Sequence, residues 1–111
     1  MLLDEGLSGS ITYRDFRAPG TFYSWRKVAV VGAIVVTGER LVVWAAKGKV
    51  VDVPLGNPLR AAITVTATGE PPDGITFSYD AAAFSPDRSG TVEVHFRTEA
   101  TLAVIHLLNT A

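Results

Sequence analysis

Apolar and polar residues alternate one by one in three separate stretches of this sequence. In residues 91–97 two valines and a phenylalanine share one face, and the same pattern recurs in residues 62–68 and 74–80. Successive side chains of a β-strand point to opposite faces of a sheet, so this alternation is typical of a half-buried strand. Turn-forming stretches rich in Gly, Pro, Asp and Ser separate the runs. The chain is therefore predicted to be mainly β.

Four further strands precede these three. They are expected at residues 10–17, 27–36, 41–45 and 49–55, with short polar or glycine-containing turns dividing the last three. No repeat, low-complexity stretch or linker interrupts the order. One domain is therefore expected over residues 1–111, with residues 1–9 as an N-terminal extension and residues 10–97 holding the strands.

The last part of the chain, residues 98–109, changes to a helical period. At 100° per residue, positions 100, 104, 107 and 108 share an apolar face, and the polar side chains gather opposite. Thr98 is the expected N-cap, and Glu99 would lie in the first turn, where the helix dipole favours a negative charge. The predicted fold is a seven-stranded antiparallel bent sheet or partly open barrel, of four plus three strands, capped by this C-terminal helix.

Residues 32–44 read as an apolar strand, a threonine, a short turn, an Arg-Leu pair and a second apolar strand. Together with residues 50–55 and 85–98, this hairpin resembles the pleckstrin-homology-like (PH-like) fold, in particular its GRAM-like and bacterial PH-like branches. Residues 11–17 and 85–91 are also similar to small bacterial proteins of unassigned role. The resemblance implies a non-catalytic binding domain, and bacterial members of this fold form homo-oligomers.

Composition narrows the classes of function. The 111 residues are 48% hydrophobic and include no cysteine, which excludes a disordered chain, a disulfide scaffold and a thiolate metal site. A net charge of -1 provides no basic field, so nucleic acid is not an expected partner. The longest apolar run, residues 28–36, is far shorter than the ~20 residues of a membrane-spanning helix. The start of the chain is acidic and lacks a cationic leader. We expect a cytoplasmic protein with no transmembrane segment.

Catalytic and metal-binding patterns are absent from the sequence. The two histidines, His95 and His106, are expected on the outer face of a strand and on the polar side of the helix. No nucleophile-elbow glycine pattern, H-E-x-x-H motif or phosphate-binding glycine loop is present. The sequence therefore predicts no enzyme, no catalytic residue, no metal and no cofactor.

A local excess of positive charge marks residues 13–27. Four cations oppose one acid there, and the same stretch holds five of the ten aromatic residues. If the first hairpin brought them together, they could bind an anionic small molecule or a phospholipid headgroup; the four are Arg14, Arg17, Arg26 and Lys27. Pairing of these cations with acids on the surface is the structural alternative. Asp87 and Arg88 are likewise open to two interpretations, as turn residues or as ligand contacts.

Residues 28–36 and 41–46 are apolar on both faces, unlike the later strands. A strand of this kind requires cover on both sides, which a small domain with one helix has little material to provide. The resulting hypothesis is self-association, or binding of a protein partner, through this sheet surface. The expected interface residues are Val28, Val30, Ile34, Val43, Trp44 and Leu102. Internal cover by the N-terminal leucines and the first loop remains the alternative. An interaction module is thus the leading function, and anion or headgroup binding is the second.

Overall fold

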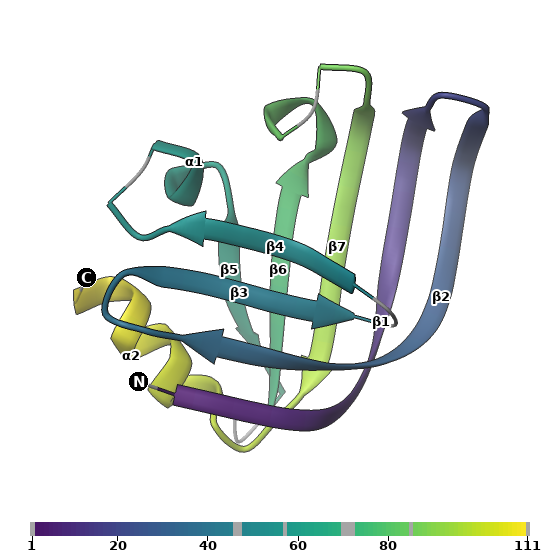
Figure 1. Ribbon diagram of the computed structural model, residues 1–111. Coiled ribbons are helices and arrows are strands. Elements are labelled where there is room, and N and C mark those ends of the chain that lie inside the picture. Colours follow the sequence, from purple (N-terminus) through teal and green to yellow (C-terminus); the bar gives the residue numbers. More distant parts are fainter. Residues whose placement is uncertain (1, 46–47, 57, 70–72, 85, 111) are drawn as a thin grey trace.

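The computed structural model describes residues 2–45, 48–56, 58–69, 73–84 and 86–110. Seven antiparallel strands form one curled half-barrel, and a helix lies at one end of it (Figure 1). The strands are β1 (Leu2–Ala18), β2 (Thr21–Val36), β3 (Arg40–Ala45), β4 (Gly48–Pro54), β5 (Thr64–Thr68), β6 (Gly74–Asp80) and β7 (Ser89–Arg97). The short turns α1 (Pro58–Ala61) and η1 (Ala81–Ala83) and the C-terminal helix α2 (Thr101–Thr110) complete the order. The predicted mainly β, seven-stranded fold with a C-terminal helix is confirmed.

The two longest strands, β1 and β2, connect the halves of the sheet. The hydrogen-bonded order is β4-β3-β2-β1-β7-β6-β5. β1 pairs with β2 along most of its length, whereas β3 pairs only with residues 32–36 of β2. Because neighbouring strands twist relative to one another, a sheet of this size curls. As a result, β3 and β4 cross in front of β5, β6 and β7 in Figure 1.

Both long strands extend beyond their predicted limits. β1 begins at Leu2, so the expected extension at residues 1–9 is a strand throughout its described part, and β2 begins at Thr21 instead of residue 27. Neither addition alternates cleanly. Residues 2–9 pair with the distant residues 30–36, and residues 21–26 pair with residues 13–18 across the hairpin turn. Gly6, with a φ of 66°, lies at the register shift between Asp4 and Leu7, where the left-handed conformation favours glycine.

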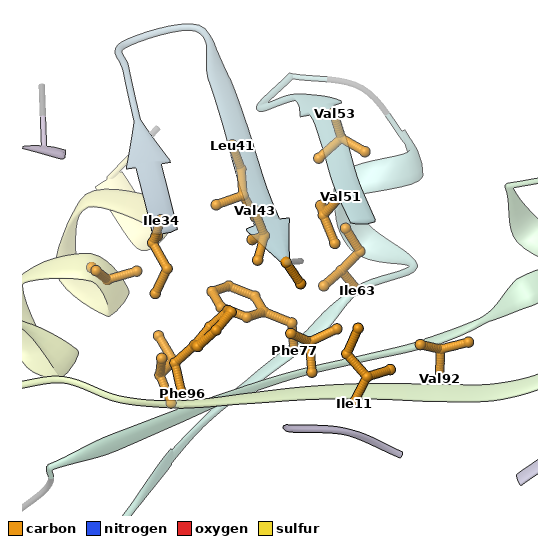
Figure 2. Packing of buried hydrophobic residues seen from close by; sticks show 14 of the residues in the cluster. Ile11, Ile34, Leu41, Val43, Val51, Val53, Ile63, Phe77, Val92 and Phe96 are labelled. Carbon is orange, nitrogen blue, oxygen red and sulfur yellow. The ribbon is translucent and has the colours of Figure 1, made fainter. Parts of the chain in front are cut away.

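Side chains from the two halves of the half-barrel meet in one hydrophobic core. Ile34 and Val43 point from the β2–β3 layer toward Phe77 and Phe96 of the opposite layer (Figure 2), and all four are fully buried. Gly32 permits this close approach, because a Cβ there would lie 2.0 Å from the Trp44 carbonyl oxygen and 2.7 Å from Phe96 Cζ. The core thus continues across both layers.

The helix α2 packs against β5 and β2 and covers one end of the half-barrel (Figure 1). It begins at Thr101 and not at residue 98. The Thr98 hydroxyl accepts from the Ala100 N–H at 2.9 Å, a contact of the kind that an N-cap threonine makes, in the turn that precedes the helix. The first helical hydrogen bond runs from the Val104 N–H to the Ala100 carbonyl at 2.9 Å. In the described part of the chain, no helix is long and apolar enough to cross a membrane.

Candidate functional site

The four cations of the first hairpin do not converge in the structure. Directly opposed residues of an antiparallel pair share a face. Arg14 is opposite Trp25 and Lys27 is opposite Thr12, both on the outer face of the sheet, whereas Arg26 is opposite Tyr13 on the inner face. The cluster predicted from sequence proximity is therefore divided between two faces.

Most of these cations already have neighbours. Arg14 forms an ion pair with Glu93 of β7. The Arg17 guanidinium lies 4.5 Å from the centroid of the Phe22 ring, and the Arg26 guanidinium lies 4.9 Å from that of Tyr23. These contacts fit the alternative in which the cations serve local pairing and stacking.

A cleft of about 450 Å³ lies at the tip of the β1–β2 hairpin, between the two layers of the half-barrel. Its aromatic walls include a cluster of Tyr13, Phe16 and Tyr23 on one side and the Tyr79–Phe84 pair, with ring centroids 5.0 Å apart, on the other. The charged lining residues are cations, and no carboxylate is among the described residues that line the cleft. The full lining is Tyr13, Phe16, Ala18, Thr21, Tyr23, Lys49, Val50, Tyr79, Ala81, Phe84, Arg88 and Val92.

Burial raises the pKa of two tyrosines of the cleft, Tyr13 and Tyr79. The Tyr79 hydroxyl donates to the Val50 carbonyl at 3.1 Å, and burial raises the pKa of Tyr79 to about 12. Burial, followed by the neighbouring Tyr23, also raises the pKa of Tyr13, and the charges of Arg26 and Arg88 oppose this shift. The cleft therefore offers phenol donors and aromatic faces beside positive charge, an arrangement that can bind a small anion with a flat apolar part.

Lys49 and Arg88, the two cations that line the cleft, have different surroundings. The Lys49 ammonium lies 3.4 Å from the Asp52 carboxylate and 5.3 Å from the Trp44 ring centroid. A hydrogen bond from Arg40 is the main cause of the lowered pKa of Asp52. Arg88 follows the turn at residues 86–87 and lines the cleft, in agreement with the interpretation of Arg88 as a possible ligand contact.

The sequence predicts only some of the residues that line the cleft. The alternation of residues 74–80 places Tyr79 on the inner face, but nothing in the sequence brings Phe84 or Lys49 to the same cleft. The histidines lie elsewhere: His95 Nδ1 is 3.0 Å from the Thr76 hydroxyl, and His106 is exposed on α2. Among the described residues, no three acidic or histidine side chains form a group that could hold a metal ion.

The predicted interface residues have different positions. Ile34 and Val43 are 0% exposed, so their assignment to an interface is wrong: Phe77 and Phe96 of the opposite layer supply their cover (Figure 2). Val28 and Val30 are half-buried on the inner face. Trp44 and Leu102 remain accessible, with 41% and 63% of their surface exposed.

Other apolar side chains are exposed on the outer face of β2. Trp25 is 61% and Val31 is 63% exposed, and Leu3 of β1 is exposed as well. We define the outer apolar surface as Leu3, Trp25, Val31 and Trp44. Among the described residues, only β1 pairs with residues 21–31 of β2, since the described part of β3 begins its pairing at Gly32. Trp25 and Val31 of this surface therefore lie along the strand edge that faces right in Figure 1.

Comparison with known proteins gives this chain no family. No protein-family model matches the sequence, and no curated protein is detectably similar to it.

Proposed function

We propose that this protein is a non-catalytic interaction module of the PH-like class, related to its GRAM-like and bacterial branches, that acts in the cytoplasm by self-association. The order of seven antiparallel strands and a C-terminal helix supports this class. The observation that carries the function is the outer apolar surface beside the open edge of β2.

An interface that buried this surface would remove apolar side chains from water and so stabilise an assembly. Burying a valine, leucine or aromatic side chain contributes about 1.5–3 kcal/mol relative to leaving it in water. Single exposed apolar residues are common, but Val31 and Trp44 lie on one face of neighbouring strands, with Val31 two residues from Ala33, the partner of Trp44. Trp25 is exposed on the same face, six residues from Val31 along β2. Exposed apolar side chains that lie close together mark sites of association.

Light scattering on the purified chain tests the proposal. We expect a mass that is a multiple of 11.8 kDa and that falls on dilution. Trp25→Ser together with Val31→Thr is expected to weaken association at least about tenfold, which corresponds to ~1.4 kcal/mol. Leu102→Ser is the matched control, since Leu102 is as exposed as Val31 but lies on α2. A monomer at high concentration would contradict the proposal, and dissociation by Leu102→Ser alone would move the interface to the helix.

The second candidate function is binding of an anionic small molecule or phospholipid headgroup, and the cleft favours it. Its aromatic walls, Lys49 and Arg88 supply both stacking surfaces and positive charge. The relevant cations are thus Arg88 and Lys49, which line the cleft, and Arg26, which lies against the lining residue Tyr23, in place of Arg14, Arg17 and Lys27.

Two probes distinguish the sources of such an anion. Benzoate, followed by tyrosine chemical shifts, represents a free aromatic carboxylate, and sedimentation with anionic phospholipid vesicles represents a headgroup. We expect Arg88→Ala to weaken binding, and binding to weaken as salt is raised. Arg14→Ala and Arg17→Ala, which change residues outside the cleft lining, serve as controls. Binding that survives Arg88→Ala but is lost in the controls would overturn the cleft as the site.

A further inference from the structure

The edge of β2 at residues 21–31 offers backbone groups to a further strand. Among the described residues, β1 is the one strand that pairs with this stretch, and β3 pairs along the other edge of β2 from Gly32 onward. Backbone N–H and C=O groups of a strand point alternately to its two sides, so half of those in residues 21–31 face away from β1. An edge of this kind accepts an extended segment as an added strand. The segment must end before Gly32, because β3 occupies the edge from there.

Positive charge distinguishes this edge from the two ends of the sheet. Residues 21–31 contain Arg26 and Lys27 and no acid. Both side chains are exposed, and in the described part of the chain neither forms an ion pair, while the Arg26 guanidinium lies over the Tyr23 ring. At the ends of the sheet, Lys49 of β4 already pairs with Asp52, and β5 carries no charged residue. A partner that complements the edge of β2 is therefore negatively charged.

The two cations of the edge lie on opposite faces of the sheet. Lys27 is opposite Thr12 on the outer face, and Arg26 is opposite Tyr13 on the inner face. A flat anionic surface, such as a membrane, approaches one face and so meets one of the two. A strand added at the edge continues both faces, and its consecutive side chains alternate between them. Two consecutive acids in such a strand therefore reach Lys27 and Arg26 together.

We propose that this edge binds an extended acidic segment of another protein as an added strand, with two consecutive carboxylates facing Lys27 and Arg26. The inference goes beyond the proposed self-association, because the segment belongs to a different chain. A second copy would bring the same two cations to the edge. The one pair of consecutive acids in this sequence, Asp4 and Glu5, lies in β1, where Asp4 already pairs with Ile34 of β2.

The neighbours of the two cations specify the rest of the segment. Val28 and Val30 are half-buried on the inner face, and Trp25 is 61% exposed on the outer face. Directly opposed side chains on one face lie about 4.5–5.5 Å apart, close enough for apolar contact. An apolar residue on one side of the acids would cover Val28, and an apolar residue on their other side would cover Trp25. The expected pattern is apolar-acid-acid-apolar, which has the same form in both chain directions.

A capped synthetic peptide of sequence Thr-Val-Thr-Ile-Glu-Glu-Phe-Thr tests this pattern. In the antiparallel direction its glutamates face Lys27 and Arg26, its isoleucine faces Val28 and its phenylalanine faces Trp25. Fluorescence anisotropy of the labelled peptide measures its affinity. Replacement of both glutamates by glutamine should weaken binding about tenfold, because it removes both charges and keeps the shape of the side chains. Added salt should weaken binding of the original peptide.

Substitutions in the protein test the two cations separately. Arg26→Gln and Lys27→Gln should each weaken binding of the peptide about two- to fivefold, as expected for one exposed charge pair. Arg97→Gln is the matched control, because it removes the same charge from an exposed side chain of β7. Equal weakening by Arg97→Gln would indicate attraction to the whole chain and overturn the assignment to this edge.

Methylation of the peptide backbone distinguishes an added strand from attraction between charges alone. The N–H groups of a bound strand point alternately toward β2 and away from it. Methylation of one alternate set of amides should therefore abolish binding, and methylation of the other set should leave most of it. Equal effects of the two sets would overturn strand addition. Hydrogen exchange locates the segment, because backbone amides within residues 22–30 of β2 should exchange more slowly when the peptide is bound.

The outcomes distinguish this inference from self-association. Peptide binding by a chain that light scattering shows to be a monomer would support the inference and remove the proposed function. A dimer that does not bind the peptide would support the proposed function and overturn the inference. Binding to anionic phospholipid vesicles that Lys27→Gln abolishes, without binding of the peptide, would replace the added strand with a membrane surface.

Discussion

Apolar side chains in the two parts of β2 have different surroundings. Residues 32–36 lie between β1 and β3, and their inner side chains Ile34 and Val36 are buried. Residues 21–31 have β1 as their one paired strand in the described part of the chain, and Phe22, Trp25 and Val31 remain exposed. Hydrophobicity alone therefore does not decide burial within one strand. The number of neighbouring strands and the presence of an opposite layer decide it.

The largest expected difference between the two parts is in core packing. Ile34→Ala should lower the free energy of unfolding by about 2–5 kcal/mol, because it leaves a cavity against Phe77 and Phe96. Val31→Ala removes exposed methyl groups and should cost less than about 1 kcal/mol. Urea denaturation at protein concentrations low enough to exclude association measures both. An equal decrease in the free energy of unfolding for both variants would contradict the contrast between residues 32–36 and residues 21–31.

A second prediction concerns Gly32, at the junction of the two parts. Gly32→Ala should destabilise the fold by about 1–3 kcal/mol, because its Cβ would meet the Trp44 carbonyl and the Phe96 ring. Gly38→Ala is the matched control, since a Cβ there meets no atom within 4 Å. Thermal unfolding compares the pair. If both variants kept the stability of the original chain, the two layers would not depend on close approach at Gly32.

The strands with clean alternation could be predicted from the sequence. β6 and β7 have nearly their expected limits, because half-buried strands leave a period of two in the sequence. Residues 2–9 lack this pattern, and only their pairing with the end of β2 makes them a strand. Long-range pairing of this kind is not encoded in a local period.

The candidate site was predicted less well than the fold. Arg14 and Arg26 are close in sequence, but the register directs them to opposite faces. Ile34 and Val31 are both apolar, but Ile34 lies on the inner face, where the opposite layer covers it, and Val31 lies on the outer face and is exposed. The cleft joins Tyr13, Lys49 and Arg88 from distant segments, so proximity in sequence could not identify it.

A smaller effect on stability is expected at Tyr79, which lines the cleft together with Thr21 and Tyr23 of β2. Tyr79→Phe removes the hydrogen bond to the Val50 carbonyl and should cost about 0.5–1.5 kcal/mol at neutral pH. The pKa of Tyr79 is about 12 in the folded chain, whereas in the unfolded chain it has the ordinary value of a tyrosine, 10.0. Between these values the unfolded state binds fewer protons, so stability should fall as pH rises.

Measurement of unfolding as a function of pH separates the contribution of the Tyr79 hydrogen bond from the effect of its raised pKa. Below about pH 10 both states keep the proton, and the difference between the original chain and Tyr79→Phe should be constant. From there to about pH 12, the original chain should lose the advantage that its raised pKa provides, and the two curves should converge. Parallel curves throughout this range would show that Tyr79 is not protected from titration by folding.

The smallest expected effect on stability concerns the ion pair between Arg14 of β1 and Glu93 of β7. It lies on the outer face of the sheet, where Arg14 is opposite Trp25 of β2. Both side chains are partly exposed, so water and salt weaken the attraction, and ordering two long side chains has an entropic cost. A double-mutant cycle with Arg14→Ala and Glu93→Ala should give a coupling of about 0.2–1 kcal/mol that decreases with added salt. A coupling well above that range would show that side-chain pairing contributes substantially to holding this part of the hairpin. The expected small value would instead assign its stability to backbone pairing with β1 and to the inner aromatic side chains, which leaves the outer edge of β2 available for a second strand.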